Sequence, residues 1–212
     1  MRESLYATAG ADPTQEDCFH RLERNLFERL EQGLSPNLVY HDLAHIRYVL
    51  EKTAFLAERE DFPKGERHLL LLAALYHDSG FLVGPADHEL RSCEIARRDL
   101  RREGFSAQDI EKVCDAIMAT KIPQQPDSDA GKILADADLF YMGTAEYDLY
   151  AEKLYREISF SRPDFSRTEW LEMQISFLQK HRYHTDYGQK VLEPVKQKHL
   201  ERLLRAREHG KR

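Results

Sequence analysis

Cysteine is scarce in this sequence. Only Cys18, Cys93 and Cys114 occur among 212 residues, and they are far apart. Their spacing fits neither a disulfide framework nor the paired cysteines of a zinc site. Because disulfides are rare in the reducing cytoplasm, we expect a cytoplasmic protein.

A long hydrophobic segment is also lacking. The longest apolar run begins at Leu69 and is too short to span a bilayer. The N-terminus shows no basic region followed by an apolar core, which a signal peptide would have. We therefore expect no membrane partner.

Positive charge is not in excess, because the formal net charge is -6. Binding of long nucleic acid depends on many lysines and arginines that neutralise phosphates. The acidic balance argues against that function class. The sequence does not indicate an oligomeric state.

Most of the 8 prolines and 10 glycines lie between apolar segments rather than inside them. Within those segments apolar residues recur at helical spacing, and none alternates as a half-buried strand would. We predict an all-α protein with a flexible N-terminus at residues 1–14 and a single domain at residues 15–212. The expected helices cover residues 15–32, 43–55, 69–80, 88–103, 107–118 and 130–142, and the helices after Gly143 are interpreted as scaffold.

Residues 69–80 are the most informative stretch. A nearly unbroken apolar run predicts a helix buried on all sides, and Gly80 is expected to end it as a C′ residue. The run ends in His77 and Asp78, and a buried charge is costly unless it is paired. A divalent metal is the natural partner, because it binds imidazole nitrogen and carboxylate oxygen together.

Further candidate ligands lie upstream and downstream. Asp42 is a plausible N-cap, so His41 and His45 would face the same space around a helix start. Asp136 and Asp138 lie in a strongly apolar segment. They are about 200° apart on a helix, so they cannot easily both point at one metal.

The order His45, His77-Asp78, Asp138 resembles the ligand order of the HD superfamily of metal-dependent phosphohydrolases. The resemblance covers residues 40–143 and implies an HD-domain helical bundle with its metal-site core in that range. It implies that these four residues hold one or two divalent ions and that Asp78 bridges them if there are two. Mixed nitrogen and oxygen ligation permits Mn, Fe, Co, Ni, Zn or Mg.

The start Tyr40-His41-x-x-x-His45 is similar to the subset of the family that includes the cyclic nucleotide phosphodiesterases. That resemblance implies hydrolysis of a small phosphoester, such as a cyclic nucleotide, by a metal-activated water. His41 would be the general acid, and Asp78 would be catalytic as well as a ligand. The chain departs from the usual His-Asn by having Asp42, which adds negative charge near an anionic substrate. Asp136 would orient a ligand or act as a cap.

Three more residues are candidates for substrate binding, each with a plainer alternative. Arg91 could hold a phosphate by bidentate hydrogen bonds, or be one of several solvated arginines. Lys121 could contact phosphate, or only suit the dipole of a helix end. His88 could be a further polar group at the site, or a solvated histidine in a first helical turn.

Two other functions remain open. A non-catalytic HD module could bind a nucleotide or a partner, although all four ligands are present. A di-iron oxygenase on the same fold would, by resemblance, need extra histidines between Asp78 and Asp138. Only His88 lies in that interval.

Overall fold

The computed structural model describes residues 13–209, and within that range the chain is helical and contains no strand. The predicted all-α class is therefore confirmed. The predicted flexible N-terminus lies outside the described residues except for positions 13 and 14, which begin the first helix. No helix in residues 13–209 is both long and apolar enough to cross a membrane. The main helices are α1 (Pro13–Gly33), α2 (Leu43–Arg59), α3 (Arg67–Tyr76), α4 (His88–Arg102), α5 (Ala107–Met118), α6 (Asp129–Asp138), α7 (Tyr147–Ser161), α8 (Arg167–Lys180) and α9 (Glu193–His209).

Helix α3 is the centre of the larger group of helices. Every residue from position 69 to 76 is buried, and α3 contacts α1, α2, α4, α5 and α6. Burial on all sides explains why this segment is apolar without periodicity. The residues that follow α3 are thereby held deep in the protein.

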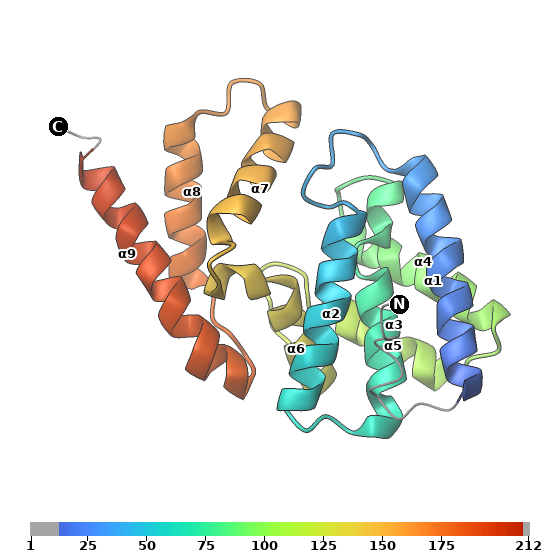
Figure 1. Ribbon diagram of the computed structural model, residues 1–212. Coiled ribbons are helices and arrows are strands. Elements are labelled where there is room, and N and C mark those ends of the chain that lie inside the picture. Colours follow the sequence, from blue (N-terminus) through green and yellow to red (C-terminus); the bar gives the residue numbers. More distant parts are fainter. Residues whose placement is uncertain (1–12, 210–212) are drawn as a thin grey trace, which may run out of the picture.

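Helices α7, α8 and α9 form a second layer beside the α1–α6 group (Figure 1). They have an apolar cluster of their own, which includes Trp170, Ile175, Leu178 and Leu203. The side chain of Tyr48 on α2 packs against both this cluster and the one around α3. The short 3₁₀-helix η4 (Phe140–Gly143) also contacts α6, α7 and α9, so it connects the two layers.

Asp136 joins the C-terminal segment to α6. Its carboxylate accepts hydrogen bonds from the backbone N–H of His184 and from the backbone N–H and hydroxyl of Thr185. The chain then continues through the π-helix η5 (Gly188–Leu192) into α9. Asp136 is thus a cap for this turn, one of the two roles predicted for it.

Side chains cap the first turn of several helices, and the predicted Asp42 cap is one of them. Asp42 accepts a hydrogen bond of 2.8 Å from the backbone N–H of His45, and Ser106 accepts one from Asp109. Asp87 differs, because it occupies the N-cap position of α4 with φ of 48° and its side chain caps no N–H group. Its carboxylate instead lies 3.2 Å from Nζ of Lys121.

The role predicted for Gly80 is wrong. The α-helix ends at Tyr76, and Gly80 lies within the following 3₁₀-helix η3 (Ser79–Leu82) without a positive φ. A Cβ atom at Gly80 would lie 1.9 Å from the backbone oxygen of His88 and 2.9 Å from the backbone nitrogen of Ser92. Glycine is therefore needed here for the close approach of α4, not for a left-handed helix end.

We predict that Gly80→Ala lowers the free energy of unfolding by about 1–3 kcal/mol or more, because the clash is with backbone and cannot be relieved by a rotamer change. Gly65→Ala is the matched control, since no atom lies within 4 Å of the Cβ position there. Urea unfolding followed by circular dichroism measures both. Equal midpoints for the two variants would contradict the explanation.

Candidate metal centre

His77 follows α3 directly and is fully buried. Its Nδ1 lies 2.8 Å from the carbonyl oxygen of Ala74 and donates a hydrogen bond to it. A proton on Nδ1 leaves the lone pair on Nε2 free, which is the arrangement common in metal-binding histidines. The local winding of the chain after α3 thus fixes the tautomer of His77.

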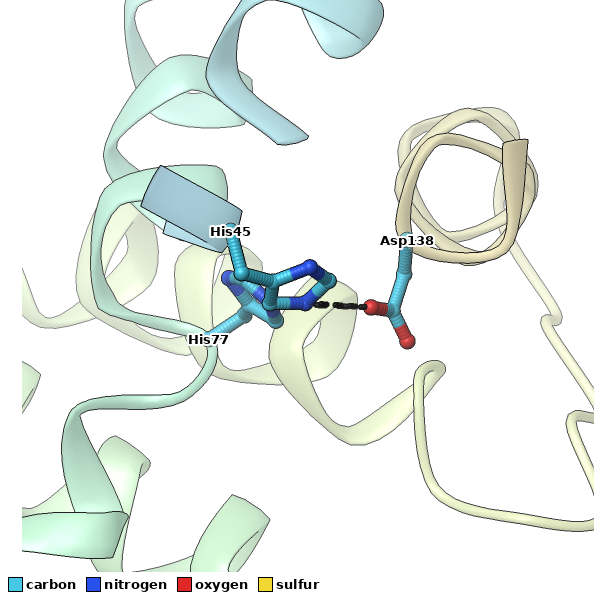
Figure 2. A group of neighbouring side chains, drawn as sticks. All are labelled: His45, His77 and Asp138. Carbon is cyan, nitrogen blue, oxygen red and sulfur yellow. Dashed lines mark hydrogen bonds and ion pairs between the residues drawn. The ribbon is translucent and has the colours of Figure 1, made fainter. Parts of the chain in front are cut away.

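Three side chains from three different helical segments meet at this point (Figure 2). Nε2 of His45, in the first turn of α2, lies 3.4 Å from Nε2 of His77. Oδ1 of Asp138, at the end of α6, lies 3.1 Å from the first nitrogen and 3.7 Å from the second. One donor atom from each residue lies within 4.8 Å of the other two.

Asp78 joins this group from the side. Its Oδ2 lies 3.4 Å from Nε2 of His45 and 3.3 Å from Nε2 of His77. The other oxygen, Oδ1, lies 3.4 Å from Nε2 of His88. Asp78 therefore extends between the histidine pair and the start of α4.

The cluster of His45, His77 and Asp138 fits a divalent ion, and Asp78 lies beside it. Donor atoms about 2.1 Å from a tetrahedral metal are about 3.4 Å from one another, and the separations to the two histidine nitrogens run from 3.1 to 3.7 Å. Oδ2 of Asp78 is also buried without a hydrogen bond. A buried carboxylate oxygen without a donor needs another positive partner.

The pKa shifts of these side chains also indicate that the group favours a bound cation. Burial raises the pKa of Asp78, but the charge of His77 and the close approach of the His45 and His77 ring nitrogens outweigh it and hold that pKa well below its usual range. Burial lowers the pKa of His45, whereas the hydrogen bond to Asp138 and the nearby Asp78 carboxylate outweigh it and raise the pKa to about 10. The two carboxylates stabilise positive charge between them, as either a proton or a metal ion.

His41 lies next to this centre and has a partner that the sequence analysis missed. Its Nδ1 lies 2.5 Å from Oε1 of Glu157, on α7. The other Glu157 oxygen accepts hydrogen bonds from the backbone N–H groups of Tyr40 and His41. Burial raises the pKa of Glu157, but these hydrogen bonds and the charge of His41 outweigh it and lower the pKa.

Glu157 could have been recognised by its position. It shares a face of α7 with Tyr150 and Leu154, which pack against the apolar cluster of the C-terminal layer. An acidic residue on an apolar stripe indicates a buried partner. That partner, His41, is 116 positions away, so sequence spacing alone could not identify it.

His88 and Phe81 complete the entrance to the centre. The ring of Phe81 packs against His41 at 4.2 Å and against His88 at 4.4 Å between centroids. Nε2 of His88 lies 3.6 Å from Oε1 of the buried Glu89. The structure thus brings His88 to the site, whereas it does not bring the other two predicted substrate contacts there.

Arg91 and Lys121 lie outside the cavity described below. The guanidinium of Arg91 donates a hydrogen bond of 3.0 Å to the carbonyl oxygen of Ala86. Lys121 is paired with Asp87. Both interactions lie around the start of α4.

A cavity of about 200 Å³ opens beside the metal centre. His41, Asp78, His88 and Asp138 line one end of it, and residues of α7 and α8 line the other. The helices that the sequence analysis interpreted as scaffold therefore also form a wall of the candidate site. A single apolar residue on these helices does not by itself predict a cavity wall, because the residues that face it across the cavity are distant in the sequence.

Comparison with known proteins agrees with this geometry. Residues 42–143 match the sequence profile of the HD domain family. No curated protein sequence matches the chain. The fold is similar to the crystal structure of a predicted HD superfamily hydrolase from an uncultured Thermotogales bacterium, with a TM-score of 0.55 and 22% sequence identity. The similarity covers 86% of this chain and 89% of that one, so the two share their fold.

The matched segment contains His45, His77, Asp78 and Asp138, and ends at Gly143. The predicted resemblance to the HD superfamily is confirmed at this level, while the similarity to cyclic nucleotide phosphodiesterases stays a prediction. Residues 42–143 are thus similar to the HD domain family, and they contain a side-chain cluster that can hold a divalent metal ion.

Proposed function

We propose that this protein is a metal-dependent hydrolase of a small phosphoester. The observation that carries the proposal is the convergence of two imidazole nitrogens and a carboxylate oxygen, with Asp78 beside them, at the wall of a cavity. A structural metal site is closed on all sides, whereas a catalytic site keeps positions open for water and substrate.

One or two divalent ions would be held by His45, His77, Asp78 and Asp138. When bound, a divalent metal supplies an acidified water and neutralises negative charge on the phosphoryl group. Hydrolysis also needs a proton for the departing alkoxide. His41 lies in the cavity wall and would provide it.

Glu157 would position His41 for that step. Its carboxylate accepts the hydrogen bond from Nδ1, so Nε2 is the ring nitrogen left to exchange a proton with the substrate. A carboxylate beside the imidazole also stabilises the protonated ring. In this pair His41 is therefore the general acid, and Glu157 is the carboxylate that positions it.

The kind of phosphoester that is hydrolysed is also part of the proposal. The Tyr40-His41-x-x-x-His45 start supports a phosphodiester such as a cyclic nucleotide. Whether the substrate is a phosphodiester or another phosphoester, the expected partner is a small phosphorylated molecule in the cytoplasm.

Purified full-length protein tests the proposal directly. We expect bound divalent metal by mass spectrometry, and hydrolysis of at least one ester in a panel of phosphomonoesters and phosphodiesters with added Mn or Ni. Bound metal without turnover on the whole panel would instead favour a non-catalytic binding module.

Asp78→Ala should abolish metal binding and hydrolysis, because it removes the carboxylate whose Oδ2 is close to both histidines. Metal analysis after dialysis and a rate assay are the measurements. Asp148→Ala is a suitable control, since Asp148 is exposed and pairs with Arg202 on α9. Full metal occupancy in Asp78→Ala would exclude Asp78 as a ligand.

Asp138→Asn and Asp136→Asn should separate two neighbouring carboxylates. The first should lose metal with little change in folding. The second should keep metal but lose about 1–3 kcal/mol of unfolding free energy, because the buried Asp136 carboxylate accepts three hydrogen bonds. Metal content and urea midpoints measure the two effects, and the reverse pattern would show that Asp136 is the ligand.

His41→Ala should keep metal and fold but lower turnover by about 10²–10⁴-fold, the usual contribution of one general acid. The loss should be small for p-nitrophenyl esters, whose leaving group scarcely needs a proton, and large for alkyl esters. Glu157→Gln should show the same dependence on the leaving group, more weakly. Equal losses for both ester types would make His41 a binding residue, and loss of metal would make it a ligand.

A further inference from the structure

The cavity beside the metal centre is chemically divided. Its metal end carries all the lining side chains that are charged or can become charged near neutral pH, namely His41, Asp78, His88, Glu89 and Asp138. Its far end is formed by Leu154 of α7 and by Trp170, Met173, Phe177 and Leu178 of α8. A molecule that fills the cavity must therefore be polar at one end and apolar at the other.

The far end offers little for a polar substituent. One polar pair lies there, in which the hydroxyl of Tyr147 donates a hydrogen bond of 2.8 Å to Oε1 of Gln174. The Tyr147 hydroxyl proton and the Gln174 side-chain oxygen thus satisfy each other. Burying a sugar or another polyol against this wall would leave several hydroxyls without partners, which is costly.

Positive side chains are missing from the wall. Within residues 13–209, no lysine or arginine lines the cavity. The sequence makes Lys121 and Arg91 candidates for phosphate contacts. Lys121 is instead paired with Asp87, and Arg91 is hydrogen-bonded to the Ala86 carbonyl group. Sites for polyphosphates use lysines and arginines to neutralise each added phosphoryl group, and this cavity instead presents three carboxylates.

We propose that the substrate carries a single phosphoryl group esterified to an apolar alcohol, whose carbon chain or ring lies against α7 and α8. The inference rests on the proposed hydrolase function and adds the substrate class to it. In the reaction, water oxygen bonds to phosphorus, the ester P–O bond breaks, the apolar alcohol leaves with a proton from His41, and the proton lost by the water replaces the one on His41. Nucleoside triphosphates and sugar phosphates are disfavoured by the same wall.

Rates with a homologous series of substrates test this class. We expect kcat/KM to rise by about fourfold per methylene from methyl phosphate to hexyl phosphate, which corresponds to the burial of each CH₂ group. Glucose 6-phosphate, a 3′,5′-cyclic nucleotide and a nucleoside triphosphate are the comparison substrates. Each of them should be slower than hexyl phosphate.

Binding of the product alcohol gives a readout that does not depend on activity. Trp170 is the only tryptophan in the chain and lines the far end of the cavity. Hexan-1-ol should therefore change the tryptophan fluorescence in a saturable way, whereas glycerol should not.

Met173→Gln makes the far wall polar with little risk to folding, because Met173 is 41% exposed. It should lower kcat/KM for hexyl phosphate by about fivefold more than for methyl phosphate, and weaken the fluorescence response to hexan-1-ol. Leu149→Gln is the matched control. Leu149 is also an exposed apolar residue, at 59%, but it does not line the cavity.

The outcomes separate the two proposals. Saturable binding of hexan-1-ol without hydrolysis of any ester would support the apolar end and overturn the proposed function. Hydrolysis that is independent of chain length, unaffected by Met173→Gln, or faster with the triphosphate or the cyclic nucleotide would overturn the inference and leave the proposed function standing.

Discussion

The burial of the Asp78 carboxylate beside two imidazoles is the interaction on which the rest of the structure depends. Asp78 is 5% exposed and His77 is fully buried. A carboxylate in such a place is stable only with positive charge or hydrogen-bond donors around it. The surrounding helices supply histidines rather than lysine or arginine, and a ring nitrogen can release its proton to bind a metal.

The scaffold places these groups by simple means. An apolar helix, α3, carries His77 and Asp78 into the interior because its own burial requires it. The Asp42 cap sets the first turn of α2 and therefore the position of His45. The end of α6 brings Asp138 from the opposite side (Figure 2), and Gly80 allows α4 to approach closely enough for His88 to reach Asp78.

The C-terminal layer forms a wall of the cavity beside this charged centre. Glu157 on α7 contacts His41, and α7 and α8 provide an apolar wall next to the metal end of the cavity. The metal centre is assembled from the α1–α6 group, whereas the surface that would select among substrates comes largely from α7 and α8. The two parts meet at Tyr40, His41 and the short η4 segment.

The helices, most of their caps and the four candidate ligands could be predicted from the sequence alone, because periodicity, capping residues and short motifs are local signals. Helix geometry indicates that Asp136 and Asp138 would not easily share one metal, and the resemblance to the HD family selects Asp138 as the candidate ligand. The pairing of His41 with Glu157, the place of Arg91 and Lys121 outside the cavity, and the reason for Gly80 could not be predicted from the sequence. Each of these depends on which surfaces meet in the folded chain, and only tertiary packing brings residues more than a hundred positions apart into contact.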